Sequence, residues 1–276
     1  MKKLFLALII LLMFLFACDK SIDIRDAVFA SLPADIAENV VVEPPPTPPA
    51  PRTGAEILRR MEANRVSDGS IVVMTMTIQG RRGDRTISAK TWSRNITDSF
   101  TEYLAPARER GTKMLKLGDQ LWTYSPDTDR TILISGHMLR QSVMGSDMSY
   151  EDMMEDPVLV NDYNAKIDGE ETLNGRPVWI LELTAKKEGM AYAKRRLWVD
   201  KERYIGLKEE MFASSGTLLK RLEVHEVMQV DNRWIAKSMT YRDMLRDGNG
   251  TKVAIDSIEF SNNLPAHLFT KAALRR

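Results

Sequence analysis

The sequence has almost no cysteine and very little histidine. Cys18 is the single cysteine among 276 residues, so the chain forms no internal disulfide and builds no multi-cysteine metal site. The three histidines, His137, His225 and His267, lie far apart on different predicted elements. No H-E-x-x-H, G-x-S-x-G or S-x-x-K motif is present, and neither is a glycine-rich phosphate loop. We therefore predict that the protein is not an enzyme, with no catalytic residue, no cofactor and no metal ion.

The chain also lacks an excess of charge of either sign. It contains 39 lysine and arginine residues and 38 aspartate and glutamate residues, for a formal net charge of +1. A basic surface of the kind that binds nucleic acid is therefore not expected, and no nucleic-acid partner is predicted. Partners should be selected by shape and apolar surface instead.

The N-terminus has the organisation of a bacterial lipoprotein signal. Met1-Lys2-Lys3 gives a basic start, and Leu4 to Phe16 is an uninterrupted apolar run too short to span a bilayer comfortably. Leu15-Phe16-Ala17-Cys18 then matches a lipobox. We predict that residues 1–17 form a signal peptide and that Cys18 carries diacylglycerol and an N-acyl chain such as palmitate. The alternative is an ordinary signal peptide that ends beside a coincidental cysteine.

Residues 18–52 are predicted to tether the anchor to a folded domain. Glu43 to Arg52 holds six of the twelve prolines and should be an extended spacer. At about 3.1 Å per residue it reaches about 30 Å. Asp19 resembles the enterobacterial signal that retains lipoproteins in the inner membrane, although it is equally explained as a polar tether residue. The expected location is the periplasmic face of the cell envelope, on the inner membrane if Asp19 acts as this signal and otherwise on the outer membrane.

Residues 53–276 have the texture of an antiparallel β domain that follows one helix. Thr53 and Glu56 form a capping box for a helix to about Asn64. About eleven short alternating runs follow, with a strong hairpin signal at Asn174-Gly175. A change of apolar phase in the last run predicts a β-bulge near Asp256. Because large open sheets curl, we predict a mainly β fold, a curved and unclosed antiparallel barrel with a helix on its concave side.

The stretch from His137 to Asp156 interrupts the strands and is unusually rich in methionine. One interpretation is a loop and short helix whose methionines fill one end of a core. The other is a movable plug that gates an apolar cavity. The acidic residues after Tyr150 are interpreted as a solvated helix start, with Ser149 and Asp152 as a capping pair. The methionines concerned are Met138, Met144, Met148, Met153 and Met154.

This stretch resembles the signature of the outer membrane lipoprotein-sorting protein family in the LolA/LolB-like superfamily. The most specific part is the run from Gly145 to Asp152, G-S-D-M-S-Y-E-D, preceded by Arg140 and Ser142. Trp122-x-Tyr124-x-Pro126 and Trp198-x-Asp200 are weaker matches. The resemblance implies an unclosed antiparallel β-barrel with helices on its concave side and a hydrophobic cavity for acyl chains. It also implies an RND-type (MMPL-like) transporter as a partner.

Two groups of candidate residues follow from the pattern and the resemblance. The motif group is expected to hold the stretch in place through hydrogen bonds and capping, although direct contact with a ligand or partner stays open; it consists of Arg140, Ser142, Gly145, Ser146, Asp147, Ser149 and Asp152. The cavity group is apolar, but strand phase alone does not say which face is concave; it consists of Met74, Met76, Trp92, Trp122, Met144, Met148, Trp198 and Met211.

The predicted function is that of a membrane-anchored periplasmic protein that binds lipid or a lipidated protein and carries or presents it. One alternative is an accessory or structural subunit of an envelope complex, with a filled core and no ligand. The other is an envelope enzyme that modifies lipids.

Overall fold

The computed structural model describes residues 53–80, 83–156 and 158–276. The predicted signal peptide, Cys18, Asp19 and the proline-rich tether lie outside these described residues. Within them, no helix is both long enough and apolar enough to cross a membrane.

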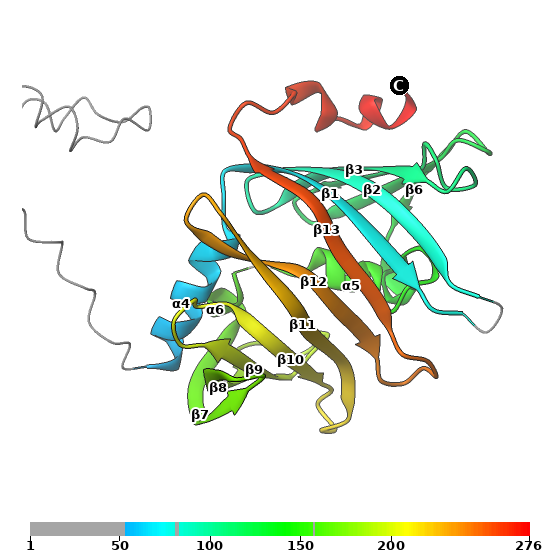
Figure 1. The fold of residues 1–276 in the computed structure, drawn as a ribbon. Coiled ribbons are helices and arrows are strands. Elements are labelled where there is room, and N and C mark those ends of the chain that lie inside the picture. The colour runs from blue at the N-terminus through cyan, green and yellow to red at the C-terminus, as the bar shows by residue number, and fades with distance from the viewer. Residues whose placement is uncertain (1–52, 81–82, 157) are drawn as a thin grey trace, which may run out of the picture. The chain divides into compact units, whose positions relative to one another are not determined.

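Thirteen strands of the described region form one antiparallel sheet (Figure 1). The sheet runs in the order β6-β5-β4-β3-β2-β1-β13-β12-β11-β10-β9-β8-β7. Strands β1 to β6 form the first meander and β7 to β13 form the second, and the pair of β1 with β13 joins them. β6 and β7 do not pair, and the barrel is therefore unclosed. The strands are β1 (Gly69–Ile78), β2 (Arg85–Arg94), β3 (Asp98–Ala105), β4 (Lys113–Leu117), β5 (Gln120–Ser125), β6 (Arg130–Ile134), β7 (Tyr163–Leu173), β8 (Arg176–Ala185), β9 (Lys194–Asp200), β10 (Gly206–Phe212), β11 (Leu218–Val230), β12 (Arg233–Asp243) and β13 (Thr251–Phe260).

The predicted fold class is confirmed, and the strand count is thirteen rather than about eleven. Two local predictions are also confirmed. The β7–β8 hairpin turns at Asn174 and Gly175, which have φ values of 51° and 76°. Val73 pairs with Ser257 while Met74 pairs with Ile255, which leaves Asp256 as the extra residue of a bulge.

The helix before the sheet packs on the inner face of the sheet. This face is defined here as the one covered by α4 and by the stretch from His137 to Asp156, which is called the central insert. α4 (Gly54–Arg65) begins with the predicted capping box of Thr53 and Glu56 and ends one residue later than expected. It contacts β7, β12 and α6 (Leu159–Asp162). Ile57 and Leu58 are completely buried there against Leu181 and Leu183. Burial of one such leucine or isoleucine side chain contributes roughly 1.5–3 kcal/mol, so this contact fixes α4 on the sheet.

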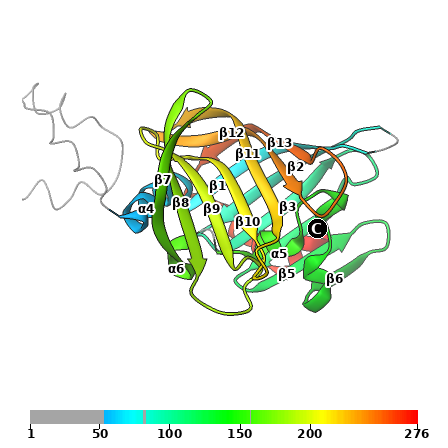
Figure 2. The same cartoon turned by 90° about the horizontal axis from the view of Figure 1, so that it is seen from below.

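Short helical turns cover both faces of the first meander. η1 (Gly136–Arg140), η2 (Val143–Gly145) and α5 (Tyr150–Met154) belong to the central insert, and Figure 2 shows α5 enclosed by the curving strands. η3 (Ala266–Leu268) and η4 (Lys271–Arg275) lie on the opposite side of the sheet, at the top of Figure 1, where η4 contacts β4 and β5. β4 and β5 are therefore covered on both faces, and Met114 and Leu115 are buried in separate clusters.

Candidate functional site

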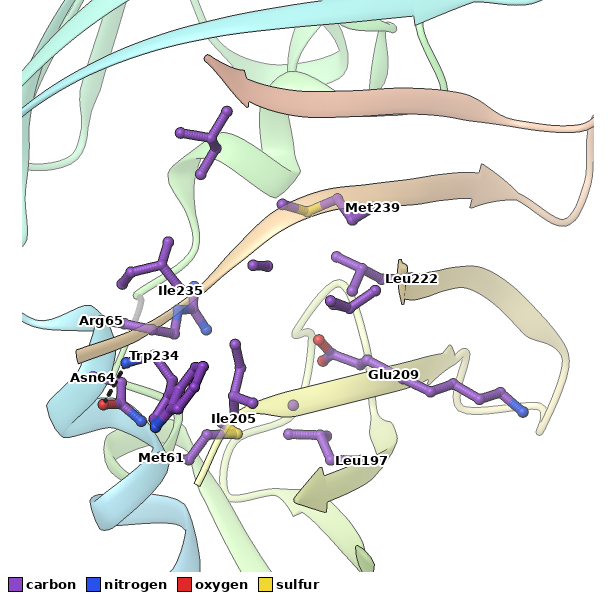
Figure 3. Close-up of a pocket in the computed structure, with 15 residues that line it drawn as sticks. Met61, Asn64, Arg65, Leu197, Ile205, Glu209, Leu222, Trp234, Ile235 and Met239 are labelled. Atoms are coloured by element: carbon purple, nitrogen blue, oxygen red, sulfur yellow. Dashed lines mark hydrogen bonds between the residues drawn. The ribbon is translucent and has the colours of Figure 1, made fainter. Parts of the chain in front are cut away.

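An apolar cavity lies between the end of α4 and the inner face of β9 to β13 (Figure 3). Its volume is ≈ 280 Å³. This space, here called the chamber, is slightly smaller than the range of about 300–1,000 Å³ that ligand sites occupy. Its apolar lining comes from Met61, Leu197, Ile205, Leu222, Val224, Trp234, Ile235, Ala236, Met239 and Ile255.

A second cavity continues from the chamber and is more polar. Its volume is ≈ 330 Å³, and it lies among the β2–β3 turn, Lys116 and the central insert. Arg65, Glu209 and Leu222 line both cavities, so the two spaces adjoin. We call the second one the vestibule. The pair therefore offers an apolar compartment that adjoins a charged one.

A buried arginine supports the floor of the vestibule. Arg195 is only 3% exposed and forms ion pairs with Glu155 and, at 2.7 Å, with Glu209. Its guanidinium carbon also lies 4.9 Å and 5.0 Å from the ring centres of Tyr163 and Tyr192. Burial raises the pKa of the Glu155 carboxyl, an effect that the positive charge of Arg195 opposes. Removing one partner of such a buried set costs about 3–5 kcal/mol, because the remaining charges stay desolvated.

The acidic run of the insert starts a helix, α5, as expected, but two of its carboxylates bind the protein and are not simply solvated. Glu155 reaches Arg195 on β9, and the Asp152 carboxylate accepts hydrogen bonds from the Ser149 amide (2.6 Å) and from the Tyr192 hydroxyl. Sequence spacing does not predict the contacts of Asp152 with Tyr192 and of Glu155 with Arg195, since each pair is 40 residues apart. The capping box of Ser149 and Asp152 is present as predicted.

Asp147 is the main anchor of the insert on the sheet. Its carboxylate accepts a hydrogen bond from the Thr251 hydroxyl at 2.6 Å and from the Asp243 amide at 3.1 Å. Its carbonyl accepts one from the Lys220 ammonium at 2.7 Å. Ser146 is fully buried, and its carbonyl accepts a hydrogen bond from Arg246. These contacts tie the insert to β11, β12, β13 and the loop that follows β12.

The remaining motif residues shape the backbone of the insert. Ser142 and Ser149 form an isolated antiparallel bridge that closes the loop between them. Gly145 has a φ of 76°, a value that favours glycine, and Met144 before it also has a positive φ of 52°. Arg140 is exposed. The motif thus holds a compact loop, and its polar side chains are directed mostly at the protein itself.

The predicted cavity methionines divide between core and vestibule. Met74, Met76 and Met144 pack in or against one buried cluster on the inner face. Met148 and Met211 line the vestibule. Among the five insert methionines, all except Met148 pack against that same buried cluster.

The three predicted tryptophans lie elsewhere. Trp92 and Trp122 pack with Leu274 of η4, whereas Met114 on the neighbouring strand belongs to the inner-face cluster. Trp198 lies between Leu197 and Val199, which pack beneath α4, and so faces the opposite way. None of the three lines the chamber or the vestibule.

None of the residues that line the chamber belongs to the cavity group predicted from the sequence. Apolar periodicity places such side chains on one face of a helix or strand, but it does not distinguish a packed side chain from one beside a cavity. Within the described residues, no group of histidine, cysteine, aspartate and glutamate side chains is arranged to hold a metal ion.

Residues 96–276 match a family model whose description reads only "Uncharacterized protein", and the chain belongs to that family. No curated protein matches the chain.

Solved structures agree with the fold and with the family resemblance. A DUF1329 family protein from Desulfovibrio piger is 27% identical over 80% of this chain and 97% of its own, with a TM-score of 0.74. An outer membrane lipoprotein-sorting protein domain from Vibrio parahaemolyticus is 26% identical over 81% of this chain and 98% of its own, with a TM-score of 0.71. A LolA superfamily protein from Nitrosomonas europaea is 22% identical over 81% of this chain and 100% of its own, with a TM-score of 0.66. The predicted resemblance to outer membrane lipoprotein-sorting proteins is confirmed, and the LolA superfamily protein shares the fold.

Proposed function

We propose that the protein binds the acyl chains of a lipid or a lipidated protein at the periplasmic face of the cell envelope and carries or presents them. The observation that carries this proposal is the apolar chamber beneath α4. An acyl chain gains about 0.8 kcal/mol for each methylene that leaves water, before the cost of ordering the chain. The adjoining vestibule gives such a chain a route out to a polar group.

The relatives support this class of ligand. The Vibrio parahaemolyticus domain is described as a lipoprotein-sorting protein, and it covers nearly the same part of the chain. Anchoring through Cys18, with Asp19 selecting the membrane, would keep the chamber close to a bilayer that supplies acylated cargo. An RND-type transporter is the proposed partner for delivery or release.

One observation favours the alternative of an accessory subunit without a ligand. Most insert methionines pack against a buried cluster, as expected for gap-filling core residues. The chamber is lined by different residues, however, and stays available. The alternative of a lipid-modifying enzyme has no comparable support, since neither cavity brings a histidine to its lining.

Filling the chamber tests the proposal. Val224 is 7% exposed and lines the chamber, so Val224→Trp should occupy the space that an acyl chain would take. We expect at least a tenfold loss of affinity, or about 1.4 kcal/mol, in displacement of a fluorescent fatty acid. The matched control is Glu223→Trp, the exposed neighbour on the same strand, which should bind normally. Equal affinity in the two variants, with both folded by circular dichroism, would contradict acyl binding in the chamber.

A further inference from the structure

We propose that the ligand is an anionic amphiphile whose carboxylate or phosphate head lies in the vestibule between Lys116 and Arg65 while its acyl chain fills the chamber. This inference rests on the proposed function and specifies the chemistry of the head group. It follows from which charges in the vestibule are already paired and which are not.

The five carboxylates that line the vestibule all have partners. Glu155 and Glu209 are paired with Arg195. Asp98 accepts hydrogen bonds from Arg94 at 2.8 Å and from the Gly118 amide at 3.2 Å. Asp152 accepts from Ser149 and Tyr192, and Asp156 accepts from the Val158 amide at 2.8 Å and from Asn161 at 3.1 Å. Arginine side chains already neutralise Asp98, Glu155 and Glu209, whereas Asp152 and Asp156 are held by neutral donors.

Two of the three vestibule cations, in contrast, have no hydrogen-bond or ion-pair partner among the described residues. Lys116 lies on β4 in the same phase as Met114, whose side chain is buried on the inner face. Lys116 is half-buried, and burial lowers the pKa of its ammonium group, an effect that the negative charges of Asp156, Asp119 and Asp98 oppose without forming an ion pair with it. Leaving a charge partly desolvated and unpaired is costly, and an anion beside it would remove that cost.

Arg65 of α4 supplies the second cation. It is the last residue of α4, and it lines both the chamber and the vestibule. Figure 3 shows its side chain extending from α4 toward the residues of the chamber. A guanidinium at this junction can donate two parallel hydrogen bonds to a carboxylate or phosphate.

The arrangement of the two cavities determines where the acyl chain of the ligand lies relative to its head group. Arg65, Glu209 and Leu222 border both spaces, so a chain in the chamber places its head beside the vestibule cations. Fatty acids and single-chain phosphate esters share this chemistry. A free anion without a chain would leave the chamber empty and gain only the polar contacts.

The test uses the full-length, lipid-anchored protein in membrane vesicles, labelled with a photoactivatable fatty acid. Laurate, dodecyl phosphate, dodecanol and inorganic phosphate are compared as competitors of labelling. We expect laurate and dodecyl phosphate to compete at least about tenfold better than dodecanol, because the neutral alcohol forms no charge-assisted hydrogen bonds with the two cations. A tenfold ratio corresponds to about 1.4 kcal/mol. Inorganic phosphate should not compete.

Substitutions test whether Lys116 and Arg65 cause the preference for an anionic head group. Lys116→Met and Arg65→Met should each reduce the preference for laurate over dodecanol while labelling by the alcohol analogue persists, and Lys116→Arg should retain the preference. Arg59→Met, at an exposed arginine of the same helix, is the control and should behave like the unmodified protein.

Each outcome decides one question. If laurate and dodecanol compete equally in the unmodified protein, or if Lys116→Met and Arg65→Met both keep the preference, the anionic head site is wrong and acyl binding stands. Competition by inorganic phosphate alone would identify an anion site without a chain and overturn the amphiphile. If no amphiphile competes, acyl binding in the chamber itself fails.

Discussion

Glu62 and Arg195 are charged side chains buried on the inner face, and they are accommodated in different ways. Glu62 on α4 is 4% exposed, and its carboxylate accepts a hydrogen bond of 2.9 Å from the Val160 amide. Arg195 is held by two carboxylates, yet its Nε atom has no partner. Glu62 links α4 to α6, and Arg195 links β9 to the insert through Glu155. The two side chains therefore help to position α6 and the insert.

Glu62→Gln should make stability less dependent on pH. Burial raises the pKa of Glu62 above its ordinary 4.5, so the unfolded chain ionises first as the pH rises and the folded state loses relative stability. The substituted amide keeps an oxygen that can accept from Val160 but never ionises. We therefore expect the variant to be more stable than the unmodified protein at pH 7, with the difference shrinking as the pH falls toward 4.5.

Urea unfolding between about pH 4 and about pH 7 measures this difference, over a range that starts near the ordinary glutamate pKa. Glu223→Gln, at an exposed carboxyl on β11, serves as the control and should show no comparable trend. A gain for Glu62→Gln that is equally large at both ends of this range would exclude ionisation as its cause.

At the scale of elements, the central insert combines a fixed part with a part that borders the site. Asp147 and Ser146 attach it to the sheet, and Met144 packs against the buried cluster of the first meander. Met148 instead lines the vestibule. The insert is thus a packed element with one edge at the cavity, and its role as a gate stays a prediction.

Aspartate substitutions separate the two parts of the insert. Met148→Asp should lower acyl affinity about tenfold or more, since a carboxylate at the vestibule opposes entry of an apolar chain, and it should change the melting temperature little. Met144→Asp should instead destabilise the fold by about 2–3 kcal/mol, because it buries a charge in a packed cluster.

Calorimetry and fatty-acid displacement on the same samples measure both effects. Gln141→Asp, an exposed position in the insert, is the control and should leave stability and affinity unchanged. Unchanged affinity in Met148→Asp would remove the insert from the binding site, and a folded, fully stable Met144→Asp would show that its contact with the cluster is dispensable.

At the scale of the whole molecule, the proposed function needs both the anchor and the β domain. A diacylglycerol with an additional N-acyl chain gives stable membrane attachment, whereas a single chain is only marginal. The proline-rich segment before Thr53 would then set how far the chamber reaches from the membrane surface.

Cys18→Ala should release the protein from the membrane fraction. Mass spectrometry of the N-terminal peptide of the unmodified protein should find Cys18 as the first residue, bearing the mass of a diacylglycerol and an acyl chain. Ser21→Ala, three residues further along the tether, should fractionate normally. Retention of Cys18→Ala in the membrane, or cleavage at another position, would contradict the predicted anchor.

Features of short range were determined by the sequence alone. The capping boxes at Thr53 and Ser149, the turn at Asn174-Gly175 and the bulge at Asp256 each depend on residues close along the chain, and all four are present. Alternation also identified the class of fold, because period-2 patterns report strands wherever one face is buried.

Only the tertiary structure decided which face of each strand borders the cavity. Alternation assigns Met114 and Leu115 to opposite faces, and it took the positions of the insert and of η4 to distinguish the inner face from the outer one. The same holds for the partnership of Glu155 with Arg195 and for the lack of an ion-pair partner of Lys116 among the described residues. These contacts depend on which distant segments the curvature of the sheet brings together. Neither the hydrophobic period nor the local propensity of a segment encodes how close it comes to another segment.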